Sequence, residues 1–245
     1  MTIIGLETEG GTAGFITTPH VMESPDLGRV GLFQERLLGL KQRVAEAGIA
    51  LELHPGAEVY PFMGALKAID DGVPLTLAGS GKYVLVDTPF NQLPHDFEDF
   101  LFGLQTRGIT PILAHPERSN VFQADPEVLL KFVKTGVVLQ VNAGSLKSRY
   151  GPVAKQFAER LLERRLAHIV ASDTHRPGRS PALGSFAADE AGELGAEYVR
   201  MLTIDSPRAI VNGQTLPLLP TPPPEKPSGW FRRLVSGDKN LYRFG

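Results

Sequence analysis

Cysteine is absent from this chain of 245 residues, and neither sign of charge predominates. Without cysteine, neither a disulfide-stabilised scaffold nor a thiol nucleophile is available. The formal net charge is -2, so bulk positive charge does not hold the chain to nucleic acid. No apolar run approaches the length of a membrane span, and no basic region precedes an apolar run at the N-terminus. We therefore expect a cytoplasmic protein.

Short apolar runs alternate with helical stretches along most of the chain. Each run ends in a polar or charged residue, and the six runs are Ala13–Thr17, Ala50–Leu53, Tyr83–Val86, Pro111–Leu113, Val137–Val141 and His168–Ala171. The intervening helical patterns are Gly31–Ala47, Asp96–Arg107, Pro126–Thr135 and Pro152–Arg165. This alternation predicts an α/β fold with a parallel sheet covered by helices. The length fits one large barrel or two small domains, and regular strands about 30 residues apart favour the barrel.

The two ends of the chain depart from this pattern. Residues Thr2–Glu9 have a helical pattern that ends at Gly10-Gly11, so the first expected element is a helix and not a strand. We expect the barrel to span residues 1–215, followed by a proline-rich linker and a short tail in residues 216–245. Within that tail, Trp230–Leu234 is basic and aromatic. It is either a poorly ordered end or a segment that docks on a partner or a membrane surface.

Candidate metal ligands follow the predicted strands. They are His20, Glu58, Asp87, His115, Asp173 and His175. In a barrel, the carboxyl ends of the strands meet at one face, where active sites are assembled. Carboxylates combined with imidazoles suit Mn, Fe or Zn. A single histidine is more often structural, but several such residues at equivalent strand ends predict a metal centre.

Two arginines follow these ligands on the same predicted face. Arg118 lies three residues after His115, and Arg179 lies four residues after His175. A planar guanidinium matches phosphate oxygens, although surface salt bridges explain each arginine equally well from sequence alone.

The remaining histidines are expected to have other roles. His54 precedes a proline and is expected at the surface or behind the ligands, and His95 is expected to cap a helix or contact solvent. His168 begins a predicted strand at the opposite end of the barrel, which favours a structural role. Asp70-Asp71-Gly72 looks like a metal loop but is expected to stop a helix and turn the chain.

Four motifs give the chain a family resemblance. They are Thr18-Pro19-His20, Gly56-Ala57-Glu58, Ala114-His115-Pro116-Glu117-Arg118 and Ser172-Asp173-Thr174-His175. With these motifs the chain resembles the PHP (polymerase and histidinol phosphatase) family. More narrowly, residues from about Gly10 to about Asn212 resemble the bacterial PHP-type protein-tyrosine phosphatases of capsule and exopolysaccharide loci. The resemblance implies a distorted (β/α)7 TIM-like barrel that holds up to three divalent metals, foremost Mn, with Fe, Zn or Mg as alternatives.

The resemblance also implies roles for the candidate residues. Glu58 would bridge the first two metals, Asp173 would bind the first, Asp87 and His115 the second, and His20 and His175 the third. Arg118 and Arg179 would hold the phosphate. The substrate would be phosphotyrosine on a bacterial tyrosine kinase that regulates polysaccharide export, and the enzyme a metal-dependent phosphoric monoester hydrolase.

Two features depart from the family pattern. Asp87 stands where the subfamily usually has the longer glutamate. In addition, three elements with which the family opens do not precede His20 in this sequence. They are a strand that ends in a His-Xaa-His pair, an Asp-Asp-Gly loop and an acidic ligand on the first helix. We therefore expect a barrel that lacks its first strand and part of its first helix, with strand edges that favour association between copies. A missing N-terminal segment and a short degenerate homologue both explain this.

Three other functions remain open at this point. A small-molecule PHP phosphatase, such as one acting on histidinol phosphate, would use the same ligands. A nuclease is less favoured because the chain has no strong basic bias. A phosphate-binding homologue without turnover would follow if the first metal site, which keeps only Glu58 and Asp173, fails to hold its metal.

Overall fold

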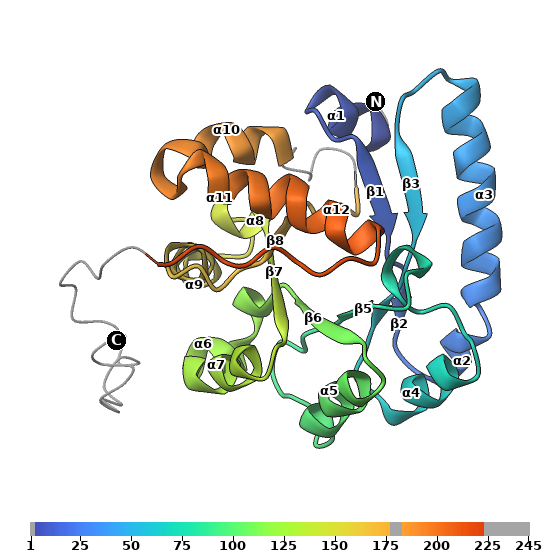
Figure 1. The fold of residues 1–245 in the computed structure, drawn as a ribbon, viewed down its shortest axis with the longest axis horizontal. Coiled ribbons are helices and arrows are strands. Elements are labelled where there is room, and N and C mark those ends of the chain that lie inside the picture. Colours follow the sequence, from blue (N-terminus) through green and yellow to red (C-terminus); the bar gives the residue numbers. More distant parts are fainter. Residues whose placement is uncertain (1–2, 177–182, 223–245) are drawn as a thin grey trace.

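The computed structural model describes residues 3–176 and 183–222 of the chain (Figure 1). Its strands are β1 (Gly14–Thr17), β2 (His20–Val21), β3 (Glu52–Pro55), β4 (Glu58–Val59), β5 (Tyr83–Val86), β6 (Thr110–Ala114), β7 (Val138–Asn142) and β8 (Ile169–Ala171). The longer helices are α1 (Ile3–Glu9), α3 (Val30–Glu46), α4 (Met63–Asp70), α5 (Phe97–Thr106), α7 (Pro126–Lys134), α9 (Pro152–Glu163) and α10 (Leu183–Leu194). Shorter helical segments are α2 (Ser24–Leu27), η1 (Leu77–Gly79), η2 (Pro116–Arg118), α6 (Asn120–Ala124), α8 (Ala143–Leu146), α11 (Ala196–Arg200), η3 (Met201–Asp205) and α12 (Ser206–Val211).

All of the described strands run parallel. Strands β1 and β3 pair with each other, and the second sheet has the order β2-β4-β5-β6-β7-β8. Parallel strands joined by helices, with helices on the outside, are the architecture that the alternating sequence pattern predicts (Figure 1). The six predicted strands and the four predicted helices are all present, with ends that differ by at most two residues.

The first two predicted strands are each divided in two. Strand β2 follows β1 after Pro19, which has no backbone N–H to donate to a neighbouring strand. Strand β4 follows β3 after Gly56, whose backbone passes close to Ile16 and Leu77: a Cβ there would lie 2.9 Å and 3.0 Å from their side chains. As a result, two predicted metal ligands open short strands instead of following long ones.

Both predicted helix stops are present. Helix α1 ends at Glu9, and Gly11 adopts the left-handed conformation with φ +88°. Helix α4 ends at Asp70, and Gly72 turns the chain with φ +84° while Val73 N donates to Ala68 O at 2.8 Å. The Asp70-Asp71-Gly72 motif is therefore a helix stop, as predicted, and Asp70 pairs with Arg107.

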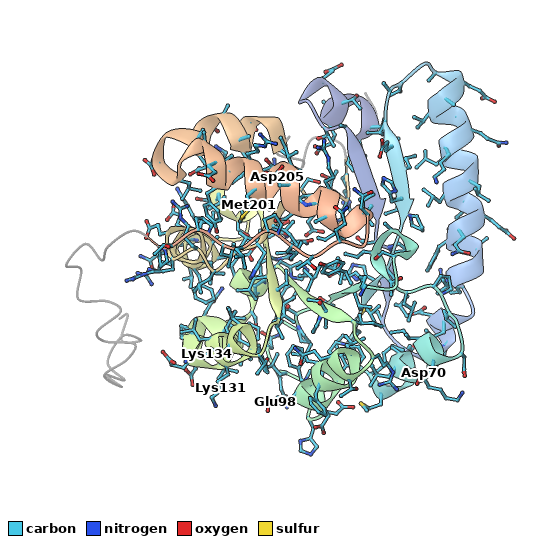
Figure 2. The ribbon with its side chains drawn as sticks, viewed as in Figure 1. Asp70, Glu98, Lys131, Lys134, Met201 and Asp205 are labelled. Carbon is cyan, nitrogen blue, oxygen red and sulfur yellow. The ribbon has the colours of Figure 1, made fainter. Side chains whose placement is uncertain are left out.

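Charged side chains on the covering helices point to solvent. Figure 2 shows Asp70, Glu98, Lys131 and Lys134 on the outer sides of α4, α5 and α7. The opposite sides of these helices carry buried apolar side chains, such as Leu66 on α4 and Phe100 on α5. This division is typical of amphipathic helices that cover a parallel sheet.

Both faces of the six-stranded sheet are buried, which explains the nearly continuous apolar runs. The outer-face side chains pack with the helices in one large cluster that includes Val84, Val86, Leu113 and Leu139. Inner-face side chains form a separate cluster of Tyr83, Leu85, Ile112, Ala114, Val138 and Ile169, which is closed by Leu77 and Ile210. Because side chains alternate along a strand, residues that continue the inner row past the strand ends point to the same interior.

The segment that follows α12 lies along the domain. Tyr83 donates its hydroxyl hydrogen to Gln214 O at 2.6 Å, and Leu216 and Leu219 pack against the two clusters. The predicted Trp230–Leu234 segment belongs to residues 223–245, which lie outside the described residues. Within the described part, no helix combines the length and apolarity needed to cross a bilayer.

His168 has the structural role that the sequence favours. It directly precedes β8, and its Nδ1 accepts a hydrogen bond from Leu139 N at 3.3 Å. Burial lowers the pKa of His168 from 6.5 to about 4. Between these two values the unfolded chain binds more protons than the folded chain, so this histidine destabilises the fold progressively as pH falls from 6.5 towards 4.

We therefore expect His168→Asn, which keeps an acceptor and cannot titrate, to flatten the pH dependence of stability. Urea unfolding at pH 7 and at pH 4.5 measures the free energy of unfolding of both proteins. Between pH 7 and pH 4.5, the free energy of unfolding of the variant should rise by about 2 kcal/mol relative to that of wild type. An unchanged difference would show that His168 does not titrate in this range.

Candidate metal centre

The predicted ligands gather at one end of the sheet, on the short strands β2 and β4 and in the segments that follow β5, β6 and β8. His20 and Glu58 are directly opposite one another in the β2–β4 register. Asp87 directly follows β5, and continues the inner row of Tyr83 and Leu85. Parallel pairing of neighbouring strands therefore brings these three side chains to one end of the sheet.

His20, Glu58 and Asp87 form a compact cluster. Each of the three side chains offers one potential ligand atom, and these three atoms all lie within 4.8 Å of one another. His115 adjoins it from β6, with Nε2 3.1 Å from Glu58 Oε1 and 3.9 Å from Asp87 Oδ1. Glu58 and His115 are buried, whereas His20 is exposed, so the cluster reaches from the interior to the surface.

The charged groups in this cluster shift one another's pKa values. Burial and the neighbouring charge of Glu58 raise the pKa of Asp87. Burial opposes ionisation of Glu58, but the hydrogen bond from His115 keeps the pKa of Glu58 below its usual value. Burial would lower the pKa of His115, yet the Glu58 carboxylate raises it overall. Two carboxylates and two imidazoles held this closely are a donor set that suits a divalent cation.

Asp173 and His175 extend the cluster from the end of β8. His175 Nδ1 lies 3.4 Å from Asp173 Oδ1, and the rings of His175 and His20 are stacked with centroids 6.1 Å apart. This contact joins residues from β2 and from the segment after β8, the two end strands of the described sheet. The side chain of His175 is 62% exposed, so it stands at the rim of the cluster.

Arg118 is held beside Asp173. One guanidinium nitrogen, Nη1, donates to Asp173 Oδ2 at 3.2 Å. Asn142 Nδ2 donates to the same oxygen at 2.7 Å. Asn142 was not among the residues predicted from sequence, although it continues the inner row of Val138 at the end of β7.

Two of the predicted ligands have an unusual backbone conformation. His115 has φ +39° and Asp173 has φ +48°, in the left-handed region that residues with a Cβ rarely adopt. Such conformations persist where the surrounding structure enforces them, and they are frequent at functional sites.

Glu117, whose role the sequence did not reveal, fixes the loop that carries His115 and Arg118. Its side chain is fully buried, and Oε1 accepts hydrogen bonds from Asn142 N at 3.0 Å and from Ser145 Oγ at 2.6 Å. Burial raises the pKa of Glu117, which these hydrogen bonds partly oppose. The carboxylate thus ties the ends of β6 and β7 together behind the cluster.

A second buried carboxylate lies on α1. Glu7 accepts hydrogen bonds from Thr174 Oγ1 at 3.1 Å and from Thr12 Oγ1 at 3.2 Å. Burial raises the pKa of Glu7. Because Thr174 separates Asp173 from His175, Glu7 anchors the segment that carries both of them. The sequence did not single out Glu7, because Thr8 and a second glutamate, Glu9, follow it directly.

The other predicted residues lie elsewhere. His54 Nε2 contacts the exposed carboxylate of Glu52 at 3.2 Å, and His95 is exposed just before α5. Arg179, the second predicted phosphate-binding residue, is outside the described residues.

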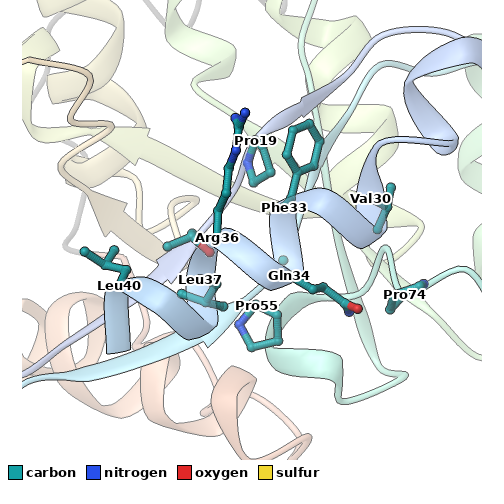
Figure 3. Close-up of a pocket in the computed structure, with 11 residues that line it drawn as sticks. Pro19, Val30, Phe33, Gln34, Arg36, Leu37, Leu40, Pro55 and Pro74 are labelled. Carbon is teal, nitrogen blue, oxygen red and sulfur yellow. The ribbon is translucent and has the colours of Figure 1, made fainter. Parts of the chain in front are cut away.

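A cavity of about 220 Å³ lies between α3 and the first strands (Figure 3). Its lining is mainly apolar and includes Val30, Phe33, Leu37 and Leu40 on α3 and Pro55 on β3. Among the described lining residues there is no histidine or carboxylate. The described lining of the cavity therefore supplies no ligands for a metal.

Comparison with known proteins places the chain in a family. A family model described as "Capsular polysaccharide synthesis, CpsB/CapC" matches residues 1–212. The chain belongs to the CpsB/CapC family. The family assignment agrees with the resemblance seen in the motifs around His20, Glu58, His115 and Asp173.

Relatives within the CpsB/CapC family include named phosphatases. The chain is 30% identical over 211 residues to tyrosine-protein phosphatase YwqE from Bacillus subtilis, covering 84% of this chain and 81% of that protein. It is 27% identical over 201 residues to tyrosine-protein phosphatase CpsB from Streptococcus pneumoniae, covering 77% and 82%. A solved structure from a study of these two proteins, which calls them metal-dependent tyrosine phosphatases, matches with a TM-score of 0.80 at 28% identity. That match covers 91% of this chain and 90% of the other.

Proposed function

We propose that this chain is a metal-dependent phosphoric monoester hydrolase that removes phosphate from phosphotyrosine in proteins. The observation that carries the proposal is the cluster of His20, Glu58 and Asp87 with the guanidinium of Arg118 close by. The cluster suits divalent cations, and a planar guanidinium suits phosphate oxygens. The names of the relatives YwqE and CpsB support phosphotyrosine as the substrate.

Each residue of the cluster has a proposed role. His20, Glu58, Asp87, His115, Asp173 and His175 would hold the metals, with Mn expected and Fe, Zn or Mg as alternatives. Divalent metals lower the pKa of bound water and neutralise charge on phosphate. Arg118 would donate hydrogen bonds to the phosphate oxygens, and Asn142 would keep Asp173 in place. No covalent bond between substrate and chain is required, in agreement with the absence of cysteine.

We further infer that the curved sheet belongs to a distorted (β/α)7 barrel of the PHP type. Strands β2 and β8 end the order of the six-stranded sheet in the described part of the chain. The stacking of His20 on His175 supports curvature, because it brings β2 close to the segment that follows β8. A further strand between β2 and β8 would complete the barrel. The family description supports a role in capsular polysaccharide synthesis, and we propose a phosphorylated tyrosine kinase that regulates this synthesis as the protein substrate.

The proposal is tested with the purified chain. Metal content is measured per chain, and turnover is compared on a phosphotyrosyl peptide and on histidinol phosphate before and after chelation and Mn addition. We expect bound metal, hydrolysis of the peptide, loss of turnover on chelation and its return with Mn. Faster turnover of histidinol phosphate would instead indicate a small-molecule phosphatase. Phosphate binding without turnover would indicate an inactive binding protein.

A further inference from the structure

Two partly exposed aromatic rings contact the side chain of Arg118, which is predicted to bind phosphate. Its Cζ lies 4.6 Å from the centroid of the Phe90 ring and 4.0 Å from that of the Tyr150 ring. Phe90 is 44% exposed and Tyr150 is 38% exposed. Single exposed apolar side chains are common, but two exposed rings that contact one arginine beside the candidate metal centre form a patch that calls for a functional explanation.

Phe90 is held in place between Arg118 and the metal cluster. Its ring centroid lies 5.8 Å from that of His115. Its carbonyl oxygen accepts a hydrogen bond from Asn120 N at 2.7 Å, and Ser119 Oγ donates to Pro89 O at 3.0 Å. The loop after β5 is therefore hydrogen-bonded to the loop that carries Arg118, and the ring of Phe90 remains partly exposed.

Tyr150 is held in place by a different segment. It lies in the turn between α8 and α9, where Arg149 N donates to Gly144 O at 3.1 Å and Gly151 N donates to Ser148 O at 3.2 Å. A Cβ at Gly144 would lie 3.2 Å from Tyr150 Cε2, which is closer than most such contacts. The glycine thus leaves room for the ring of Tyr150 to approach Arg118.

We propose that Phe90 and Tyr150 form an aromatic wall that binds the aryl group of a phosphomonoester whose phosphate is held by Arg118. This inference rests on the proposed function and names the part of the site that selects aryl over alkyl phosphates. The two rings lie over the guanidinium of Arg118. The N–H groups of the guanidinium point outward in its plane, where Nη1 donates to Asp173, and these N–H groups are the donors that a phosphate would use. An aryl group attached to that phosphate would meet the exposed parts of both rings, and contacts between rings favour it over an alkyl chain.

The test measures binding and so does not depend on turnover. Titration calorimetry on the metal-loaded protein gives the affinities for phenylphosphonate and propylphosphonate, which cannot be hydrolysed. We expect wild type to prefer phenylphosphonate, and Phe90→Leu and Tyr150→Leu each to reduce this preference about fivefold, within the range for ring–ring contacts. Propylphosphonate affinity should change less than about twofold, because Arg118 is kept.

Two controls distinguish a substrate contact from a structural role. Tyr150→Phe keeps the ring and should keep the preference, and Phe102→Leu removes an aromatic side chain that is 66% exposed on α5. An equal loss of affinity for both phosphonates would overturn the proposal, since the rings would then only position Arg118. An unchanged preference in the Leu variants, or no binding of phenylphosphonate by wild type, would overturn it as well. Metal content and peptide turnover of wild type test the proposed function separately.

Discussion

Replacement of Glu58 by glutamine is expected to lower metal affinity and turnover together, by at least about 100-fold. Glu58 is the most buried carboxylate of the cluster, and it lies within reach of His20, Asp87 and His115. Glutamine keeps the size and one oxygen of the side chain but removes the charge that a metal requires. Changes behind the ligands of metal sites already cost 10–100-fold, so the loss of a ligand should cost at least the upper value.

Metal analysis after gel filtration and turnover of 4-nitrophenyl phosphate measure the two losses. Glu52→Gln is the matched control, because Glu52 also contacts a histidine, His54, but at an exposed position away from the cluster. That variant should retain metal and activity. Thermal unfolding followed by circular dichroism shows that both variants fold. Wild-type metal content and turnover in Glu58→Gln would contradict a role of Glu58 as a ligand.

The positions of four candidate metal ligands could be predicted from sequence because they depend on local rules. A run of apolar residues indicates a strand, and in a parallel sheet the next polar residue stands at the common carboxyl end. This reasoning located His20, Glu58, Asp87 and His115, which the structure brings together. It did not foresee that Pro19 and Gly56 would divide the first two strands.

The side chains that support the cluster could not be predicted in the same way. Glu117 reaches Ser145, and Asn142 reaches Asp173, across 28 and 31 residues of sequence, so no spacing rule connects these partners. The sequence also gives no indication that His115 adopts the left-handed conformation, which residues with a Cβ rarely adopt.

The exposed aromatic side chains also lack a sequence signal. Phe90 and Tyr150 lie in separate loops, and nothing in the spacing between them indicates that both contact Arg118. Only the folded arrangement of the loops after β5 and α8 brings them to one guanidinium. Their role is therefore an inference from the structure and not from the motifs.

Replacement of Arg118 by alanine is expected to reduce kcat/KM for a phosphotyrosyl peptide by about 100- to 1,000-fold. This is the usual effect of removing one charged or hydrogen-bonding donor that stabilises developing charge in a transition state. Arg118→Lys should recover only part of the loss, because an ammonium keeps the charge but cannot bind two oxygens with a planar fork. Steady-state kinetics on the metal-loaded variants measure both effects.

Arg107→Ala separates this effect from the loss of any arginine–aspartate pair. Arg107 binds Asp70 through two nitrogens, at 2.8 Å and 2.6 Å, on the outer helices and away from the cluster. Its removal should change stability little and leave kcat/KM unchanged, because exposed ion pairs contribute little to stability. If Arg118→Ala retained metal and wild-type kcat/KM, Arg118 would serve only to orient Asp173, and phosphate would have to be bound by other donors. If the loss appeared together with lost metal, the ion pair with Asp173 would be needed to assemble the cluster. A loss of turnover at full metal content is the result that a phosphate-binding guanidinium predicts.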